Sequence, residues 1–389
     1  SGLMAASGCA PFAGPSAWPG ASPLGRDLKA YRPSNAIPTA RSNVRYKEPT
    51  GTITLRQAMA AALLNNPGLR ATAWAVRARE AERLQARLLP NPELQVSVED
   101  FGVSGQLRGA REMELTFAVS QVVWLGGQRA RRSRLAALEG REAGWRYEIR
   151  RLAVLTRTVQ SFLRVVTVQR LVALARQEEK LLKKVVKLFR ERSAAGRIAR
   201  QDLGRIRAEV QLARTQLKGA QLTRQLKVAR QMLAAQWGGV RPRFTKAAGR
   251  LEGSVALPDL SGLLKRIGKS PRVRAWQARL ATRRASVAVS KAGAIPDLTL
   301  TGGVRVLPDS GSVGFLVGVS IPLPFFARNQ GAIRAARFRV VEARARLRAT
   351  RVRIASLITR AHTTASASVA TIQRIDQMIL PKAKTAVTV

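Results

Sequence analysis

A repeat within the sequence limits the possible folds more than any other feature of this chain. Residues 270–275, SPRVRA, resemble residues 66–71, NPGLRA, and residues 295–298, IPDL, resemble residues 91–94, NPEL. Pro271 follows Pro67 by the same 204 positions that separate Pro296 from Pro92. A constant offset predicts that one structural unit occurs twice. We therefore divide the chain into an extended tail, residues 1–51, a first repeat, residues 52–250, and a second repeat, residues 251–389.

Long helices are predicted in both repeats. Residues 128–193 contain no proline, and their apolar residues recur at alternating spacings of three and four, the pattern of a coiled coil. At about 1.5 Å per residue, this helix would be about 100 Å long. A return arm with the same spacing ends near Trp237, so the two arms predict one antiparallel helical hairpin. The matching arm of the second repeat begins near Asn329, and we expect its return arm to be missing because the chain stops at Val389.

Shorter elements precede and follow these arms. Two helices are predicted before the first strand, from Thr52 or Thr54 to about Asn65 and from Pro67 to about Leu89. Apolar and polar residues alternate in residues 95–99 and 114–121, and again in 298–306 and 315–321, which predicts one two-stranded hairpin in each repeat. The fold class is therefore mainly α with a small β part. The apolar faces of the second strands, which we expect to contact lipid, consist of Leu115, Phe117, Val119, Phe315, Val317, Val319 and Ile321.

The strands also predict an oligomer. No stretch of eighteen uncharged apolar residues occurs, so a transmembrane helix is not expected. Four strands per chain cannot close a barrel, and open edges are not tolerated in lipid. Three copies would supply twelve strands, which lies within the usual range for transmembrane β-barrels. The sequence thus predicts a homotrimer with a 12-stranded barrel, continued by a hollow tube of helices.

The net charge of +45, from 68 Lys and Arg against 23 Asp and Glu, first suggests nucleic-acid binding. However, the basic residues are spread along the helical arms and form no single tail or recognition helix. We therefore expect no nucleic-acid partner and interpret the charge as a basic solvated surface. A channel lined by such a surface is expected to prefer anions.

The only cysteine is Cys9, which follows Ala6, Ser7 and Gly8. This context resembles the small-residue end of a bacterial lipoprotein signal whose front is absent. Two interpretations remain: Cys9 carries a lipid anchor, or it is an unmodified cysteine in an irregular segment.

Residues suited to catalysis or metal binding are scarce. His362 is the only histidine, and no second histidine lies at ligand spacing. One cysteine and five methionines form no soft-metal cluster. Glu99 and Asp100 are adjacent on a strand, so their side chains would point to opposite faces and could not act as an acid–base pair. We therefore predict no catalytic residues, no metal site and no cofactor, and we do not expect an enzyme.

Four segments together resemble the outer-membrane efflux protein family, or TolC-like channels, over about residues 52–389. The resemblance is closest to the branch that serves heavy-metal exporters of the cobalt–zinc–cadmium and copper–silver type. The segments are TLRQA at 54–58 before NNP at 65–67, LLPNPEL at 88–94, LGGQR at 125–129, and the basic glycine-containing tip after residue 195.

The resemblance implies a function in the bacterial outer membrane, with the helical tube in the periplasm. Such a channel would conduct substrate passively, heavy-metal cations in this branch, within a tripartite efflux system of the resistance-nodulation-division type. Its partners would be a periplasmic membrane-fusion adaptor and an inner-membrane efflux pump. A channel for drugs or other small molecules, and a coiled-coil structural or adaptor protein of the envelope, remain alternatives. The resemblance also implies that residues at the tip contact the adaptor. These residues are Gly196, Arg197, Ile198, Ala199, Arg200, Asp202 and Leu203.

Overall fold

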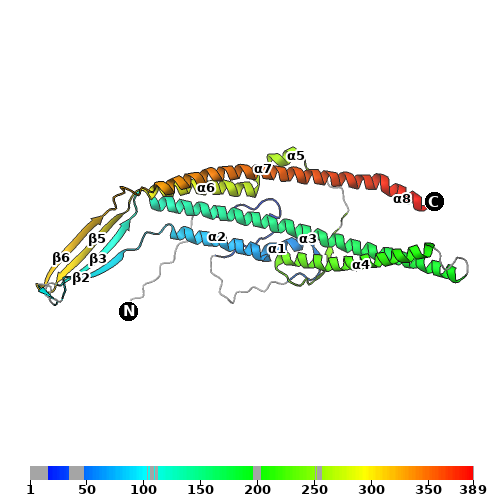
Figure 1. Ribbon diagram of the computed structural model, residues 1–389, viewed down its shortest axis with the longest axis horizontal. Helices are drawn as coiled ribbons and strands as arrows, with labels where there is room; N and C mark the ends of the chain where they lie inside the picture. The colour runs from blue at the N-terminus through cyan, green and yellow to red at the C-terminus, as the bar shows by residue number, and fades with distance from the viewer. Residues whose placement is uncertain are drawn as a thin grey trace. The chain divides into compact units, whose positions relative to one another are not determined.

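The structure is a computed structural model that describes residues 16–34, 48–102, 104–105, 109, 113–195, 203–249, 251 and 256–388 (Figure 1). The chain forms two compact units. Unit 1 comprises Ser1–Pro19, Ala75–Trp145 and Leu260–Arg360, and unit 2 comprises Gly20–Trp74, Arg146–Asp259 and Ala361–Val389. Three helices run from one unit into the other: α2 (Pro67–Gln85), α3 (Gln128–Ala194) and α7 (Gln330–Arg374).

Unit 1 contains a four-stranded antiparallel sheet in the order β2-β3-β5-β6. Its strands are β2 (Glu93–Glu99), β3 (Glu114–Val123), β5 (Leu298–Leu307) and β6 (Ser312–Ser320). The two predicted hairpins are confirmed, and the structure adds that β3 pairs with β5, so the two repeats share one sheet. The strands β2 and β6 form its two edges.

The helices of unit 1 begin and end next to the strands. Helix α6 (Pro271–Ala292) precedes β5 as α2 precedes β2, and the first residues of these two helices are Pro271 and Pro67. Proline suits the first helical position because its missing N–H would have no partner there. The short elements α5 (Leu260–Lys265) and η3 (Ile267–Lys269) lead into α6. The repeated order of helix, two strands and long helix follows the offset seen in the sequence.

Side-chain amides fasten the junction between the sheet and the helices of unit 1. Gln128, the first residue of α3, is buried and donates from Nε2 to Asp297 Oδ1 at 2.6 Å. Asn329 donates from Nδ2 to the Ser290 carbonyl of α6 at 2.7 Å. Along α3 and α6, the Arg279 Nε donates to Glu142 Oε1 at 2.8 Å. The first two contacts lie where the strands meet the helices, and the third joins α3 to α6 farther along.

Helix α3 confirms the predicted long arm almost residue for residue, since it spans 67 residues from Gln128 to Ala194. By contrast, the prediction that α2 extends to Leu89 is wrong, because α2 ends at Gln85 and the next residues form turns. Pro90 would in any case end the helix before Leu89, since the residue before a proline disfavours the helical conformation.

Unit 2 contains the rest of the helical hairpin and its packing core. Helix α4 (Leu203–Ala234) returns from the hairpin and continues as the short helix η2 (Ala235–Trp237). Helix α1 (Leu55–Asn65) is capped by Thr54, which forms a capping box with Gln57. Thr54 is one of the two caps that the sequence predicted. The core beside α1 includes Ile53, Phe162, Leu233, Trp237 and Phe244, all at most 3% exposed.

Two features of unit 2 were not predicted, a pair of short strands and a break near the end of the last long helix. Strand β1 (Gly51–Thr54) pairs in parallel with β4 (Phe244–Ala248), which closes the base of the hairpin. At the C-terminal end, α7 passes through a π-helical turn, η4 (Ile375–Ile379), into α8 (Leu380–Thr388). The boundaries of the three predicted segments, 1–51, 52–250 and 251–389, stay a prediction.

Candidate functional site

The sheet of unit 1 has one continuous apolar face that no other described element covers. Phe315 and Val317 on the edge strand β6 are 90% and 85% exposed. The strand register places apolar residues from all four strands opposite one another in successive rows. We call this surface the apolar sheet face, and its rows are Val98, Leu115, Val306 and Val313; Val96, Phe117, Val304 and Phe315; and Leu94, Val119, Gly302 and Val317.

The opposite face of the same sheet is mostly polar or small, with Leu307 and Leu316 as larger apolar residues. Thr116 and Ala118 point to that face and are buried. Glu114 forms an ion pair with Arg305 of the neighbouring strand β5, with 2.5 Å between Oε2 and Nη1. A soluble sheet normally buries its apolar face and exposes its polar face. The reversed arrangement indicates that the apolar face contacts an apolar medium or another apolar surface.

Gly303 on the polar face allows β3 and β5 to approach closely. A Cβ atom added at Gly303 would lie 2.4 Å from the Phe117 carbonyl oxygen, whereas one added at the neighbouring Gly302 would meet nothing within 4 Å. We expect Gly303→Ala to lower the free energy of unfolding by about 1 to 3 kcal/mol, because backbone must shift to accept the methyl group. Gly302→Ala is the matched control and should unfold at the wild-type temperature in detergent micelles. Equal unfolding temperatures for the two variants would contradict this reading of the sheet.

The predicted lipid-facing residues all lie on this sheet or at its end. Phe117, Val119, Phe315, Val317 and Val319 are exposed, Leu115 is half-buried in the same register, and Ile321 is exposed just beyond the end of β6. Contact of these residues with lipid stays a prediction. The contributions of β2 and β5 to this face were not predicted, although the alternation in residues 93–99 was a usable signal.

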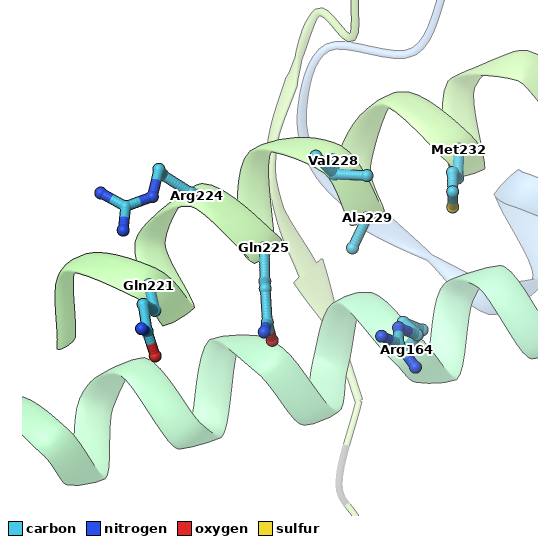
Figure 2. A pocket seen from close by; sticks show the side chains of 7 residues that line it. All are labelled: Arg164, Gln221, Arg224, Gln225, Val228, Ala229 and Met232. Atoms are coloured by element: carbon cyan, nitrogen blue, oxygen red, sulfur yellow. The ribbon is translucent and has the colours of Figure 1, made fainter. Parts of the chain in front are cut away.

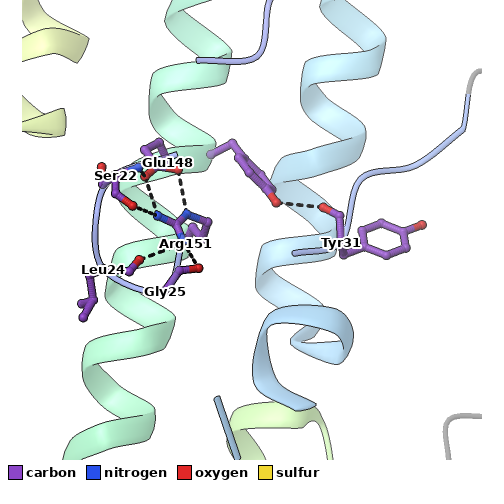
Figure 3. A network of polar contacts seen from close by, with 7 residues as sticks. Ser22, Leu24, Gly25, Tyr31, Glu148 and Arg151 are labelled. Carbon is purple, nitrogen blue, oxygen red and sulfur yellow. Dashed lines mark hydrogen bonds and ion pairs between the residues drawn. The ribbon is translucent and has the colours of Figure 1, made fainter. Parts of the chain in front are cut away.

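The N-terminal segment is held against α3 by a buried ion pair in unit 2 (Figure 3). The Glu148 and Arg151 side chains are 2% and 3% exposed, and Arg151 Nε lies 2.8 Å from Glu148 Oε2. The other donors of Arg151 reach the carbonyls of Ser22, Leu24 and Gly25 at 3.1 to 3.3 Å, and a second bond reaches Glu148. All five N–H groups of this guanidinium are therefore satisfied.

The charge of Glu148 is stabilised in spite of its burial. Burial alone would raise the pKa of Glu148, but hydrogen bonds from Arg151 and from the Ser22 backbone N–H, the latter 2.7 Å long, hold that pKa below its usual value. The neighbouring Tyr147 hydroxyl donates to the Tyr31 carbonyl at 2.8 Å, and burial raises the pKa of Tyr147. We call residues 20–31 the strap, because these contacts bind it to α3.

In unit 1, the residues just before the strap also pack on α3. A Cβ atom at Gly144 would overlap the Ala17 carbonyl oxygen, so only glycine allows this approach. The Arg77 guanidinium lies over the Trp18 ring, 5.6 Å from its centroid. Residues 1–51 were predicted to be an extended tail, and residues 16–34 have no helix or strand but make these specific contacts.

The far end of the helical hairpin contains the predicted tip. Leu203 is exposed at the start of α4, whereas Gly196, Arg197, Ile198, Ala199, Arg200 and Asp202 lie outside the described residues, as does Cys9. Nearer to the core, a groove of about 590 Å³ lies between α3 and α4 (Figure 2). Arg164 lines it from α3. Val228 and Met232, which are 50% and 58% exposed, line it from α4.

The described residues offer few groups for chemistry. They contain no cluster of three or more His, Cys, Asp or Glu side chains placed to hold a metal ion. The His362 Nε2 lies 3.2 Å from the Pro258 carbonyl oxygen. Within the same described ranges, no helix combines the length and apolar character needed to cross a membrane.

Comparison with known proteins gives a consistent result. The sequence profile of the family described as "Outer membrane efflux protein" matches residues 58–239 and 265–387. The chain is 32% identical to the cobalt-zinc-cadmium resistance protein CzcC of Cupriavidus metallidurans, over 94% of this chain and 86% of that protein. It is 28% identical to the nickel and cobalt resistance protein CnrC of the same organism, over 81% of this chain and 73% of that protein.

Solved structures show the same fold. The crystal structure of CusC superimposes with a TM-score of 0.65 at 18% identity, over 92% of this chain and 86% of that chain. The outer membrane protein VceC of Vibrio cholerae superimposes with a TM-score of 0.65 at 21% identity, over 85% of this chain and 83% of that chain. At these identities, the likeness concerns the fold alone.

Proposed function

This chain belongs to the outer membrane efflux protein family, and on that premise we propose that it is the passive outer-membrane channel of a tripartite efflux system of the resistance-nodulation-division type. In this proposal, substrate arrives from an inner-membrane pump through a periplasmic adaptor and leaves the cell through the channel. The observation that carries the proposal is the apolar sheet face, which is exposed on a sheet whose opposite face is mostly polar or small.

Three of the four strands have lengths that suit a membrane crossing, and the edge strand β2 is shorter, with 7 residues. A tilted strand needs about 9 to 11 residues to cross the hydrocarbon core. Strands β3 and β5 have 10 residues each, and β6 has 9. The edges β2 and β6 leave backbone groups that lipid cannot satisfy. We infer that β6 of one copy pairs with β2 of the next in a homotrimer, with the polar face toward water.

The helical part would then extend into the periplasm. Leu181 and Leu188 on α3 and Leu217 on α4 follow the coiled-coil spacing but are at least half exposed in a single chain, which supports their burial against a neighbouring copy. The groove beside Val228 and Met232 would be covered in the same way. We further propose that the hairpin tip, residues 196–203 without Gln201, contacts the adaptor. Leu203, the tip residue that the structure describes, is apolar and exposed.

Heavy-metal cations are the proposed substrate because both relatives reported above are named for resistance to such metals. A conduit must release each ion that it passes, so scattered weak contacts along its wall are sufficient. Metal specificity would then reside mainly in the pump and the adaptor.

The proposal can be tested with the full-length protein in its native host. Density-gradient fractionation should place the protein in the outer membrane, and cross-linking of that fraction should yield a trimer and a complex with the adaptor. A deletion strain should become more sensitive to cobalt, zinc and cadmium, and the wild-type gene should restore resistance. Unchanged sensitivity to these metals, together with increased sensitivity to drugs, would favour a drug channel. A monomer outside the outer membrane would contradict the channel itself.

A further inference from the structure

Exposed apolar side chains continue beyond the end of the sheet. The segment after β6 contains Leu323, Phe325 and Phe326, which are 65%, 67% and 92% exposed. On the other hairpin, Trp124 follows the last residue of β3, and the Arg132 guanidinium stacks 4.3 Å from its ring centroid. Aromatic side chains next to a transmembrane segment typically lie at the level of the lipid headgroups. This region is therefore where the apolar sheet face would meet water on the side of the helices.

Arginines crowd the same junction in unit 1. They occupy the first two turns of α3, the first three turns of α7 and the loop before α7, and all are exposed. None of them forms an ion pair with a carboxylate in the described part of the chain, and neither helix has an acidic residue in its first turn. We call this set the junction collar, and it consists of Arg129, Arg131, Arg132, Arg134, Arg328, Arg334 and Arg337.

The collar spans a depth slightly greater than the polar headgroup layer of one leaflet. At about 1.5 Å per residue, Arg337 lies about 10 Å along α7 from its first residue. The polar layer of one leaflet is about 5 to 8 Å thick, from the difference between a bilayer and its hydrocarbon core. Seven guanidinium groups without acidic partners would repel one another, and the positive ends of two helix dipoles add to this repulsion. A layer of phosphate groups would relieve it.

We propose that the junction collar binds the phosphate groups of anionic phospholipids, in the leaflet that faces the helical part of the channel. This inference rests on the proposed location in the outer membrane. Arginine suits the site because its planar guanidinium binds phosphate through two parallel hydrogen bonds. The adjoining Leu323, Phe325 and Phe326 favour a lipid over a nucleic acid, because a lipid brings acyl chains for these side chains to contact.

The test uses the detergent-extracted full-length protein, incubated with phosphatidylglycerol and phosphatidylcholine in equal amounts. The lipid retained after excess lipid is removed is then quantified. The collar variant carries Arg131→Gln, Arg134→Gln and Arg337→Gln. The matched control carries Arg348→Gln, Arg351→Gln and Arg353→Gln, which removes three exposed arginines about 27 to 35 Å along α7 from its first residue.

We expect the wild type and the control to retain phosphatidylglycerol in preference to phosphatidylcholine. The collar variant should bind phosphatidylglycerol more weakly by about fivefold for each arginine contact that is lost. The preference of the wild type should also fall with added salt. This salt dependence decides the question if the collar variant does not assemble.

Several results would overturn the inference. One is that the wild type forms a trimer in the outer-membrane fraction but shows no preference for phosphatidylglycerol. This result would leave the proposed function intact. Another is equal loss in the control, which would indicate general charge attraction. Displacement of the lipid by inorganic phosphate at matched concentration would indicate a free-anion site, and displacement by an oligonucleotide would indicate nucleic-acid binding. A wild type that is absent from every membrane fraction would remove the proposed function and this inference together.

Discussion

Val317→Arg is expected to prevent stable assembly of the protein in the outer membrane. Val317 is 85% exposed and lies in the middle part of β6, on the apolar sheet face. Arginine on a lipid-facing strand position costs about 2 to 4 kcal/mol near the bilayer midplane, so three copies would lose about 6 to 12 kcal/mol per trimer. The measurement is the amount of heat-labile, cross-linkable trimer in the outer-membrane fraction, compared with wild type at equal expression.

Leu316→Arg is the control for the added charge and size. Leu316 precedes Val317 on the same strand but pairs with Gly303 on the polar face. A charge that faces water should leave the trimer largely intact. If both variants assembled equally well, the apolar sheet face would not contact lipid. If only Leu316→Arg were lost, the assignment of the two faces would be reversed.

Arg151→Met is expected to destabilise unit 2 by about 3 to 5 kcal/mol, because it leaves the Glu148 carboxylate buried without its ion-pair partner. The same change removes the donors that hold the carbonyls of Ser22, Leu24 and Gly25. The strap should therefore detach, and trypsin should cleave after the exposed Arg26 and Lys29 faster than in wild type. Urea unfolding followed by circular dichroism measures the loss of stability, and timed proteolysis measures the release of the strap.

Two further variants separate stability from strap binding. Arg190→Met breaks an ion pair with Glu209 whose arginine side chain is 67% exposed, and it should cost less than about 1 kcal/mol. The double variant Glu148→Leu with Arg151→Met contains no buried unpaired charge, so much of the stability should return. Its strap should still be cleaved readily, because the three carbonyls remain without donors. Equal stability of Arg151→Met and Arg190→Met would exclude the buried pair as a determinant of the fold.

The buried pair also predicts how this difference changes with pH. The pKa of Glu148 is lower in the folded protein than its ordinary value of 4.5. A carboxyl with a depressed pKa stabilises the fold fully above its unfolded pKa, and that contribution is lost as the pH falls through the folded pKa. The stability difference between wild type and Arg151→Met should therefore be largest at neutral pH and shrink below pH 4.5. A difference that stayed constant over this range would argue against an ionised Glu148.

The long helices could be predicted because their signals are local. The absence of proline and the seam through Leu155 and Phe162 defined α3 correctly, and both residues are buried. The same seam extends backward at spacings of four and three through Arg151 and Glu148. Two charges at seam positions were a usable sign of a buried pair. The buried pair was not predicted because the strap that it binds has no periodic sequence pattern.

The joining of the two hairpins was harder to predict. Alternation along a strand fixes which side chains share a face, but it does not identify the neighbouring strand. The pairing of β3 with β5 depends on the close approach at Gly303, which a pattern of alternating residues does not reveal. The junction collar was missed for another reason. Its arginines form two groups that are far apart in sequence, and only the fold brings the starts of α3 and α7 to the same end of the sheet.

The pairing of β3 with β5 also affects how many molecules must meet. A chain with a single hairpin would need six copies to supply the same number of strands, and every seam would form between separate molecules. Here the linkage of the two repeats places the second hairpin at a high effective concentration beside the first. In the proposed trimer, half of the hairpin-to-hairpin seams can thus form within one polypeptide at any expression level. Only the three contacts between β6 and β2 would depend on protein concentration, so dilution should slow assembly as a three-body rather than a six-body process.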